Sequence, residues 1–357
     1  MALFITGIGV VLIVATALPL VRADAWWIRF FDFPRLQIIV LLIPTFIAAW
    51  FGVGTAGFAP NLLLAGLAAS MLYQCYMMFP YTLWASKQVQ QSRQPPSSNS
   101  IRLVSINVLM ENRNVATLKE ILRTVDPDVI LALETDDWWL AQMQEFEQTH
   151  PFTVYQPQGN YYGMLLYSRL KLVNPQLKFR VQDDIPSIHT RVCLLSGQEV
   201  ELYCLHPRPP VPEETARSIE RDVELLLVGK EVKSKEAPVI VMGDLNDVAW
   251  SHTSYLFRNI SGLLDPRVGR GFYNTFHANY PFIRFPLDHF FHSNDFRLLD
   301  LQRLPYCGSD HFPIFIDLSY EPSAERQQPK LEATPDEHEE ATEKILKLAQ
   351  EGDFGKL

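Results

Sequence analysis

Residues 239–251 contain the stretch of this sequence that is best suited to chemistry. Five apolar or small residues at 239–243 predict a buried strand, and Asp244 and Asn246 follow it two positions apart. Side chains two positions apart on an extended backbone point to the same side, so one carboxylate and one amide reach a single spot. The pair fits metal-assisted attack on a phosphate ester, because a carboxylate can hold a hard cation or accept a proton from water. An Asx turn without any catalysis would give the same pattern.

Polar side chains also follow most of the other predicted strands. In chain order the candidate site residues are Asn107, Glu134, His206, Asp244, Asn246, Asp288, Asp310 and His311. Acid and amide oxygens are the ligands that Mg²⁺ takes from proteins in phosphoryl-transfer sites. Taken singly, each residue has a structural alternative: a turn residue, a cap, a loop residue or a solvated strand end. What favours a site is the set as a whole, provided that the fold brings its members together.

The elements that must position these residues are short strands with few helices between them. Strands are predicted at 101–107, 129–133, 163–168, 191–195, 199–205, 239–243, 288–293 and 313–318, and helices near 115–122 and 213–229. This pattern predicts an α/β (α+β) body with two mixed sheets packed together, rather than one doubly wound sheet. Neither GxGxxG nor GxxxxGK[ST] occurs, so a nucleotide cradle of either kind is not predicted.

The first 85 residues predict a membrane region with three transmembrane helices. Only five side chains among residues 1–86 are charged. Three apolar runs, near 3–21, 36–53 and 61–84, each approach the ~20 residues that a spanning helix needs. Trp and Tyr residues lie near their ends, as they do at membrane interfaces. A signal peptide cleaved near 23–25 is the alternative for the first run, but no Lys or Arg precedes that run.

The distribution of positive charge predicts the orientation. Arg22, Arg29 and Arg35 lie between the first two runs, Lys87 and Arg93 follow the third, and the remaining loop has neither Lys nor Arg. The positive-inside rule therefore places the first loop and the body on the cytoplasmic side, with the N-terminus outside.

Polar segments flank the body. Residues 86–100 predict a linker, because they are rich in Ser, Gln and Pro. The last 37 residues hold five Lys/Arg against ten Asp/Glu and predict a solvated acidic tail. A capping box that begins at Thr334 predicts a short helix there, and a partner-binding helix is the alternative to a free tail. The four cysteines have no regular spacing, so neither a disulfide framework nor a zinc site is predicted.

Seven short segments in chain order resemble the endonuclease/exonuclease/phosphatase superfamily, whose members include deoxyribonuclease I. They cover about 101–320 of the chain. The segments are Ser105-Ile106-Asn107-Val108, Leu133-Glu134, Gly163-Met164 through Ser168-Arg169, His206-Pro207, Gly243-Asp244-Leu245-Asn246, Leu287-Asp288-His289 and Ser309-Asp310-His311. The stretch 206–210 and Trp250-Ser251 further resemble bacterial membrane-anchored members of that superfamily, which implies a multi-pass protein of a bacterial inner membrane.

The resemblance implies a four-layered sandwich of two mixed β-sheets flanked by helices, with the site at one edge. It implies a bound Mg²⁺, or Mn²⁺ in its place. Glu134 would be the main metal ligand, with Asn107 beside it and Asp310 close enough to contribute. The family often has Gln before the metal Glu, and Leu133 stands there in this sequence. That departure removes a polar contact and leaves the ligand.

The same resemblance implies the catalytic roles. Asp244 would orient or deprotonate the attacking water, while Asn246 and His206 would donate to the phosphate. His311 would contact the phosphate or act as acid or base, held by Asp288 through its other ring nitrogen. Whether His311 or Asp244 is the base stays open at this point. Among the other acidic residues, Asp247 is the one most expected to matter, because it adjoins the Asp244 and Asn246 pair.

The net charge of the body distinguishes between possible substrate classes. Residues 101–320 hold 21 Lys/Arg and 28 Asp/Glu, a net of −7, whereas a protein that binds duplex DNA tightly is expected to have a basic face. We therefore expect a membrane-anchored, Mg-dependent phosphodiesterase or phosphomonoesterase that acts on a lipid headgroup or a small phosphoester. The alternatives are a membrane-bound nuclease acting on DNA or RNA, and a non-catalytic membrane scaffold. No obligate protein partner is predicted.

Overall fold

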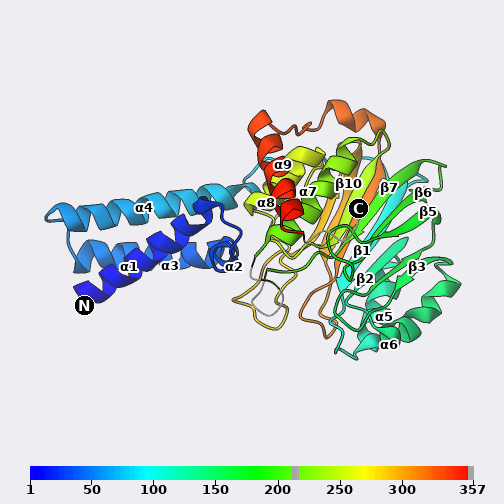
Figure 1. Cartoon of the computed structure of the whole chain (residues 1–357), viewed down its shortest axis with the longest axis horizontal. Coiled ribbons are helices and arrows are strands. Elements are labelled where there is room, and N and C mark those ends of the chain that lie inside the picture. Colours follow the sequence, from blue (N-terminus) through cyan, green and yellow to red (C-terminus); the bar gives the residue numbers. More distant parts are fainter. Residues whose placement is uncertain (211–214, 216, 353–357) are drawn as a thin grey trace.

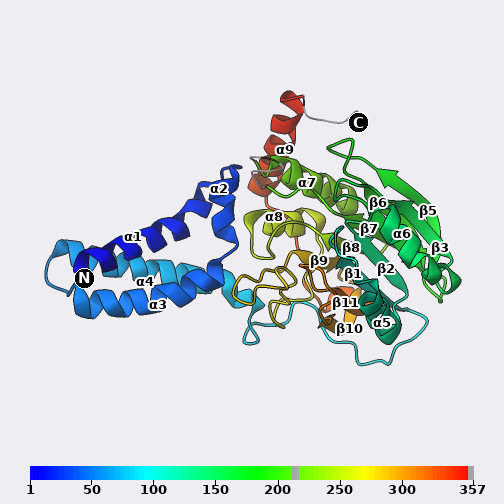
Figure 2. The same ribbon diagram turned by 90° about the horizontal axis from the view of Figure 1, so that it is seen from below.

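The computed structural model describes residues 1–210, 215 and 217–352. These residues form a helical bundle and a larger α/β body, and the bundle projects from one side of the body in both views (Figures 1 and 2).

The bundle consists of three long apolar helices, α1 (Ala2–Ala17), α3 (Arg35–Gly52) and α4 (Phe58–Met78). Short helical turns extend and connect them: η1 (Leu18–Val21), α2 (Trp26–Arg29), η2 (Phe30–Asp32) and η3 (Phe79–Tyr81). The three helices share a small apolar core, yet large apolar side chains such as Leu3 and Phe51 lie exposed on the outside. All three segments are long and apolar enough to cross a membrane, as the sequence predicts.

The body contains a six-stranded and a five-stranded sheet. The first has the order β10-β11-β1-β2-β4-β3, with β1 (Ser100–Asn107), β2 (Val129–Leu133), β3 (Phe152–Gln156), β4 (Met164–Ser168), β10 (Phe296–Arg303) and β11 (Ile314–Tyr320). The second has the order β5-β6-β7-β8-β9, with β5 (Lys171–Lys178), β6 (Ser187–Cys193), β7 (Glu199–Leu205), β8 (Val239–Asp244) and β9 (Asp288–His292). Both sheets are mixed, because β1 pairs in parallel with β2, β7 pairs in parallel with β8, and the other neighbours are antiparallel.

Helices cover the outer face of each sheet, which confirms the predicted four-layered sandwich (Figure 1). The main core lies between the sheets. Helices α5 (Val115–Val125) and α6 (Asp137–Met143) pack on the first sheet, and α7 (Ile219–Lys233) and α8 (His252–Ser261) pack on the second. The turns η4 (Gln144–Gln148) and η5 (Pro322–Arg326) are further elements of the body.

The elements that the sequence patterns miss are β3, β5, β10, α6 and α8. Strands β3, β5 and β10 are three of the four edge strands of the two sheets, and much of β5 is exposed. An edge strand buries few side chains, so it shows little alternation for a sequence pattern to detect. The strand predicted at 191–195 is β6, which starts earlier, at Ser187. The helix predicted at 213–229 is α7, and the start of that prediction falls partly on residues outside the described chain.

The linker packs against the body over part of its length, in contrast to the expectation of a free tether. Val89 is fully buried in the core between the sheets, and Gln91 forms a parallel bridge with Leu298 on the edge strand β10. The composition of residues 86–100 predicts solvation, but one apolar side chain and an unpaired sheet edge suffice to dock this segment.

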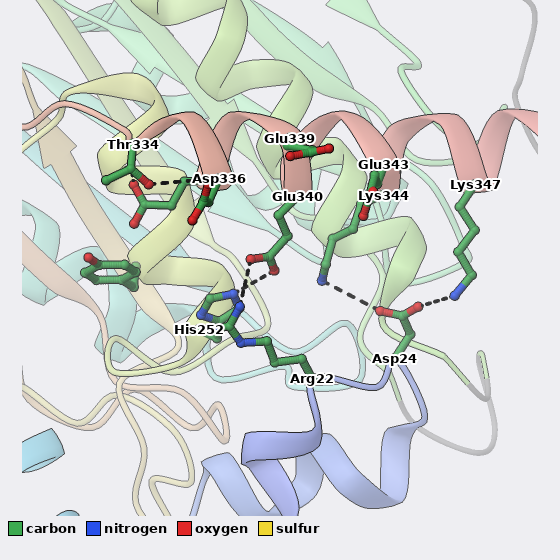
Figure 3. A pocket seen from close by; sticks show the side chains of 12 residues that line it. Arg22, Asp24, His252, Thr334, Asp336, Glu339, Glu340, Glu343, Lys344 and Lys347 are labelled. Carbon is green, nitrogen blue, oxygen red and sulfur yellow. Dashed lines mark hydrogen bonds and ion pairs between the residues drawn. The ribbon is translucent and has the colours of Figure 1, made fainter.

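The acidic tail also packs on the body, where the sequence predicts a solvated segment. Helix α9 (Pro335–Gln350) begins with the predicted capping box at Thr334 and buries Ala341 and Leu348 against α7 and α8. A pocket of about 850 Å³ lies between α9, α8 and the loop that follows η1 (Figure 3). Across it Lys347 lies 2.6 Å from Asp24. The acidic composition hides the apolar stripe that holds this helix in place.

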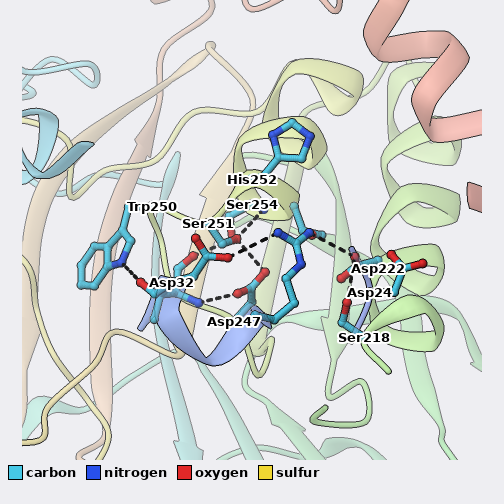
Figure 4. Close-up of polar contacts among 12 residues, drawn as sticks. Asp24, Asp32, Ser218, Asp222, Asp247, Trp250, Ser251, His252 and Ser254 are labelled. Carbon is cyan, nitrogen blue, oxygen red and sulfur yellow. Dashed lines mark hydrogen bonds and ion pairs between the residues drawn. The ribbon is translucent and has the colours of Figure 1, made fainter. Parts of the chain in front are cut away.

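The bundle and the body meet at a buried group of charged side chains (Figure 4). Arg29 lies 3.3 Å from Asp32 and 3.7 Å from Asp222, at the start of α7. Asp222 also accepts hydrogen bonds from Lys344 of α9 at 2.8 Å and from Arg221 at 2.9 Å. We call this group the junction cluster, and it comprises Arg29, Asp32, Arg35, Arg221, Asp222, Asp247 and Lys344.

The segment that follows β8 is held by the end of the bundle. Trp250 donates its indole N–H to the carbonyl of Asp32 at 2.7 Å (Figure 4), and Tyr81 donates to the carbonyl of Ala249 at 2.6 Å. Arg221 donates to the carbonyl of Asn246 at 2.6 Å. The backbone that leaves β8 is therefore fixed by residues of the bundle and of α7.

Candidate active site

Four of the predicted site residues continue the inward-facing rows of their strands. Every second residue of β1, β7, β8 and β9 lies in the core between the sheets. The corresponding position at one end of each strand carries a polar side chain instead, and these are Asn107, His206, Asp244 and Asp288. Within the second sheet, strand pairing puts three of these ends at the same edge, because β7 runs parallel to β8 and Asp288 lies opposite Asp244. Asn107 comes from the first sheet and meets them there, where it donates to Asp244. The period of two therefore aims all four side chains into one space.

Glu134 reaches the same space by leaving the alternation. It directly follows the inward-facing Leu133, so a continued strand would turn its side chain to the outer face. Instead Glu134 has a φ of +58°, in the left-handed region, where non-glycine residues are uncommon. Asn107 donates from Nδ2 to Glu134 Oε1 at 2.6 Å. The strained backbone thus redirects the carboxylate toward the edge where the other polar groups meet.

Two glycines allow the close backbone approaches that this edge requires. A Cβ at Gly163 would lie 1.8 Å from the carbonyl oxygen of Thr135, directly after Glu134. A Cβ at Gly243, where φ is +138°, would lie 2.0 Å from the carbonyl oxygen of Leu205. Both distances are shorter than any side chain could tolerate, so glycine is required on either side of the site.

Asp244 is at the centre of the site, and its Oδ2 faces three nitrogen atoms. Asn107 Nδ2 donates to it at 3.2 Å, His311 Nε2 lies 3.5 Å away and His206 Nε2 lies 3.8 Å away. The other oxygen, Oδ1, accepts the backbone N–H of Asn246 at 2.9 Å. A fully buried carboxylate is thus aimed by its own loop at two imidazole rings.

His311 is held by a second carboxylate. Its Nδ1 lies 2.8 Å from Asp288 Oδ2, and its backbone N–H donates to Ser309 Oγ at 3.0 Å. The Ser309 hydroxyl in turn donates to the carbonyl of Asn107 at 2.7 Å, which ties this loop to the end of β1. The pairing with Asp288 fixes the ring orientation and leaves Nε2 directed at Asp244.

The ionisation states of the buried groups differ. Burial raises the pKa of Glu134 to about 7, although Asn107 and His311 act in the opposite direction. Burial also raises the pKa of Asp244. For His311 burial alone would lower the pKa, but the Asp288 and Asp244 carboxylates together raise it to about 10.

Burial lowers the pKa of the second imidazole, His206, to about 4, against the influence of Asp244. Near neutral pH one ring beside Asp244 is therefore cationic and the other neutral. Paired groups whose environments push their pKa values apart are typical of acid–base sites.

The structure brings six of the eight candidates into direct mutual contact: Asn107, Glu134, His206, Asp244, Asp288 and His311. Asn246 lies at the site, but its side-chain amide donates to the carbonyl of Pro207 at 2.9 Å, so it fastens the segment after His206. Asp310 is half-buried at the rim, and its carboxylate raises the pKa of both Glu134 and His311.

Other residues at or near the site follow no sequence signal that we recognise. The ring of Tyr162 lies 5.4 Å from that of His206, and the ring of Phe276 lies 5.0 Å from that of His311. Arg221 holds the carbonyl of Asn246 from within α7, most of whose residues are buried. Asp247, singled out for its neighbours, belongs instead to the junction cluster, where it lies 3.3 Å from Arg221.

Two sets of residues could hold a cation. Asp244, Asp288 and His311 each place a ligand atom within 4.8 Å of the others. His311 and Asp288 are already hydrogen-bonded to each other, however, so two of these ligand atoms are engaged. Glu134 is the better candidate, because among the described residues no Lys or Arg pairs with it despite its burial. Its donor set of carboxylate and amide groups suits a hard divalent cation.

Known proteins share both the sequence family and the fold. The model of the Endonuclease/Exonuclease/phosphatase family matches residues 104–311. No curated protein matches the chain.

Among solved structures, the human Nocturnin catalytic domain with bound sulfate anion is 15% identical, with a TM-score of 0.51, and the match covers 68% of this chain and 99% of that chain. A functionally unknown conserved protein from Enterococcus faecalis V583 is 12% identical, with a TM-score of 0.51 and coverage of 62% and 100%. TDP2 from D. rerio, complexed with single-strand DNA product, is 18% identical, with a TM-score of 0.50 and coverage of 62% and 99%.

At these identities the structural likeness concerns the fold alone, but the family match spans more than half of the chain and includes all the strand ends described above. The chain belongs to the Endonuclease/Exonuclease/phosphatase family of hydrolases.

Proposed function

We propose that this protein is a membrane-anchored, Mg²⁺-dependent phosphoesterase that cleaves a phosphodiester or phosphomonoester by attack of water. The observation that carries the proposal is the position of Asp244, whose buried carboxylate faces His206 and His311 and is aimed by Asn107 and Asn246. A carboxylate between a cationic and a neutral imidazole can orient a water molecule and move its proton.

The carboxylate of Glu134 and that of Asp310 at the rim would hold the cation, with Asn107 beside Glu134. A bound Mg²⁺, or Mn²⁺ in its place, supplies positive charge to phosphoryl oxygens and orients the ester. Among the described residues no Lys or Arg pairs with Glu134, whose pKa is raised by burial. A divalent cation would compensate the charge of its carboxylate.

Different side chains accept and donate the protons of the reaction. Asp244 acts as the base that orients and deprotonates the attacking water, because its Oδ2 is already held between the two rings. His311 is cationic, so it donates from Nε2 to the phosphate or to the leaving oxygen, while Asp288 keeps its other nitrogen engaged. Asn246 fixes Pro207 and thereby the position of His206, which can donate to the phosphate.

Three helices that are long and apolar enough to cross a membrane support anchoring. The Arg residues between the first two helices and the Lys and Arg after the third support a cytoplasmic body in a bacterial inner membrane. The segment after β8 contacts the end of the bundle, which favours a substrate close to the membrane surface.

A membrane-bound nuclease is the second candidate, because one protein of this fold was solved with a single-strand DNA product. The net charge of −7 on residues 101–320 disfavours it, since phosphate-backbone binding depends on Lys and Arg.

The test is hydrolysis by the full-length protein in nanodiscs, with Mg²⁺ or with EDTA. The substrates are bis(p-nitrophenyl) phosphate, p-nitrophenyl phosphate, phospholipid vesicles and single- and double-stranded DNA. We expect Mg²⁺-dependent turnover of a phosphoester that Asp244→Asn abolishes. Asp295→Asn is the matched control, because Asp295 is a buried carboxylate beyond the other end of β9. Cleavage of DNA alone would favour the nuclease. Lack of any turnover by the folded wild type would favour a non-catalytic scaffold.

A further inference from the structure

The loop of residues 277–285 exposes a group of large apolar side chains next to the candidate active site. Phe282 is 85% exposed, Tyr280 59% and Ile283 54%. The loop contains no acidic residue, and its charged side chain is Arg284. Apolar and aromatic side chains with an accompanying cation are typical of segments that rest in a membrane interface.

The base of this loop is attached to the site. The backbone N–H of Ala278 donates to the carbonyl of Asp310 at 2.6 Å. Phe276, just before the loop, forms bridges with both Phe285 and His311. Three residues after the base, the chain enters β9 at Asp288. The exposed tip and the site are therefore parts of one continuous piece of backbone.

The other side of the loop touches the bundle. Gln37, in the first turn of α3, donates to the carbonyl of Phe282 at 2.9 Å. The ring of Phe33, just before α3, packs edge-on against Phe285 at 5.6 Å. Figures 1 and 2 show the gold-coloured loops of the body directed toward the bundle. The tip of the loop consequently lies at the level where α3 begins.

Other exposed aromatic side chains lie at the same end of the bundle. Trp84 is 87% exposed after η3, and Trp27 and Phe30 are 50% and 56% exposed between the first two long helices. The ends of spanning helices carry such residues where the lipid headgroups begin. An exposed apolar group joined to this level by Gln37 continues the surface that the bundle would present to lipid.

We propose that the loop of residues 277–285 lies in the headgroup layer of the same membrane that holds α1, α3 and α4. Tyr280, Phe282 and Ile283 contact lipid there, and the site receives phosphate esters carried by lipids. The second half of this statement rests on the proposed function. The first half does not, because it concerns only where the loop lies.

The position of the loop can be measured without any activity. Phe282→Cys is introduced into the full-length chain with Cys75→Ser and Cys193→Ser, since Cys204 and Cys307 are buried. The new thiol is labelled with the fluorophore NBD and the protein is placed in nanodiscs of phosphatidylcholine and phosphatidylglycerol. We expect a blue-shifted emission that lipids with a nitroxide on the acyl chain near the headgroup quench.

Leu195→Cys is the matched control, because Leu195 is 79% exposed in the turn between β6 and β7. That turn precedes β7, so it lies at the edge of the sheet opposite to the site. A label at 195 should show water-like emission and no quenching. Equal quenching at both positions, or none at 282, would overturn the membrane position of the loop.

A second measurement addresses the substrate. In Phe282→Ser/Ile283→Ser we expect the ratio of phospholipid to bis(p-nitrophenyl) phosphate turnover to fall by about tenfold, since two apolar contacts with lipid are lost. Leu195→Ser should leave the ratio as in the wild type. Turnover of the soluble ester without phospholipid turnover would refute the lipid substrate, even if the loop is quenched. Absence of turnover with both would refute the proposed function, and the labelling result would still decide the position of the loop.

Discussion

Two groups of charged residues lie close together inside this protein, and they differ in how far neighbouring positive charges compensate their carboxylates. The junction cluster pairs each of its carboxylates with Arg or Lys, whereas the site places Glu134, Asp244 and Asp288 around a single cationic imidazole, His311. The junction cluster, Asp244, Asp288 and His311 are buried, and Glu134 is half-buried. The difference indicates their roles, because charges that neighbours neutralise hold parts of a fold together, and charges left without partners are available for an ion or a substrate.

The pKa values of one carboxylate from each group show the same contrast, although burial raises the pKa of Asp247 in the junction cluster despite Arg221. Burial alone would raise the pKa of Asp222, but Lys344, Arg221 and Arg29 hold it far below its ordinary value. Burial raises the pKa of Glu134 to about 7, because Asn107 and His311 oppose this shift only in part and no Lys or Arg among the described residues pairs with Glu134. The charge of Asp222 therefore stabilises the folded state, whereas the charge of Glu134 destabilises it.

The largest expected effect is on catalysis at the candidate active site. We expect Glu134→Gln to lower phosphoester turnover by about a hundred- to a thousandfold, because the main candidate cation ligand is lost. The variant should unfold at the same or a higher temperature than the wild type, since an uncompensated buried charge is removed. Steady-state kinetics and thermal unfolding in detergent measure the two effects. A large loss of stability with little loss of turnover would assign Glu134 to the fold instead.

The converse is expected in the junction cluster. Asp222→Asn should lower the free energy of unfolding by about 3–5 kcal/mol, because Arg29, Arg221 and Lys344 lose a buried partner. Turnover per folded molecule should change little. Asp126→Asn is the control, since Asp126 also pairs with arginines but is 54% exposed, and it should cost less than about 1 kcal/mol. Equal costs for the two variants would mean that the buried pairing of Asp222 contributes no more than an exposed ion pair.

Added Mg²⁺ should stabilise the site and leave the junction cluster unaffected. At a concentration of about 100 Kd a single bound ion stabilises the folded state by about 2.7 kcal/mol, which raises Tm by about 5–10 °C. Thermal unfolding with and without Mg²⁺ measures this shift. We expect the shift to disappear in Glu134→Gln and to persist in Asp222→Asn, and the reverse pattern would place the ion in the junction cluster.

The smallest effect concerns a buried carboxylate that belongs to neither group. Burial raises the pKa of Glu224, on α7, to about 7, although Arg180 acts in the opposite direction. The unfolded chain loses this proton first, so stability falls as pH rises from about 4.5 to about 7 and then levels off. We expect Glu224→Gln to be more stable than the wild type by about 1–3 kcal/mol at pH 8 and equally stable at pH 4. Denaturant unfolding at both pH values measures this, and unchanged turnover would separate it from Glu134→Gln.

Local pattern predicts the elements that carry the site. The runs before Asn107, Glu134 and Asp244 alternate or are wholly apolar, so the strands and the polar residues at their ends are recognisable. The edge strands β3 and β5 escape detection because they bury too little. The packing of α9 also escapes detection, because the apolar stripe that includes Ala341 and Leu348 is interspersed with acidic residues.

Contacts between distant segments are beyond such patterns. Nothing near Asn246 indicates that its amide fastens Pro207, and nothing near Asp247 indicates that Arg221 takes it into the junction cluster. The sequence around Phe282 indicates an ordinary turn. Only the contact with Gln37 in the structure shows that this turn lies beside the bundle.

The sequence by itself determined which residues could do chemistry and that three helices could span a membrane, because residue type and period are local properties of the chain. Only the tertiary structure decided which charges are neutralised and which are not. That difference depends on burial and on partners more than a hundred residues away, such as Asn107 for Asp244 and Lys344 for Asp222. Desolvation and Coulomb interactions act through space, and the fold alone sets those distances.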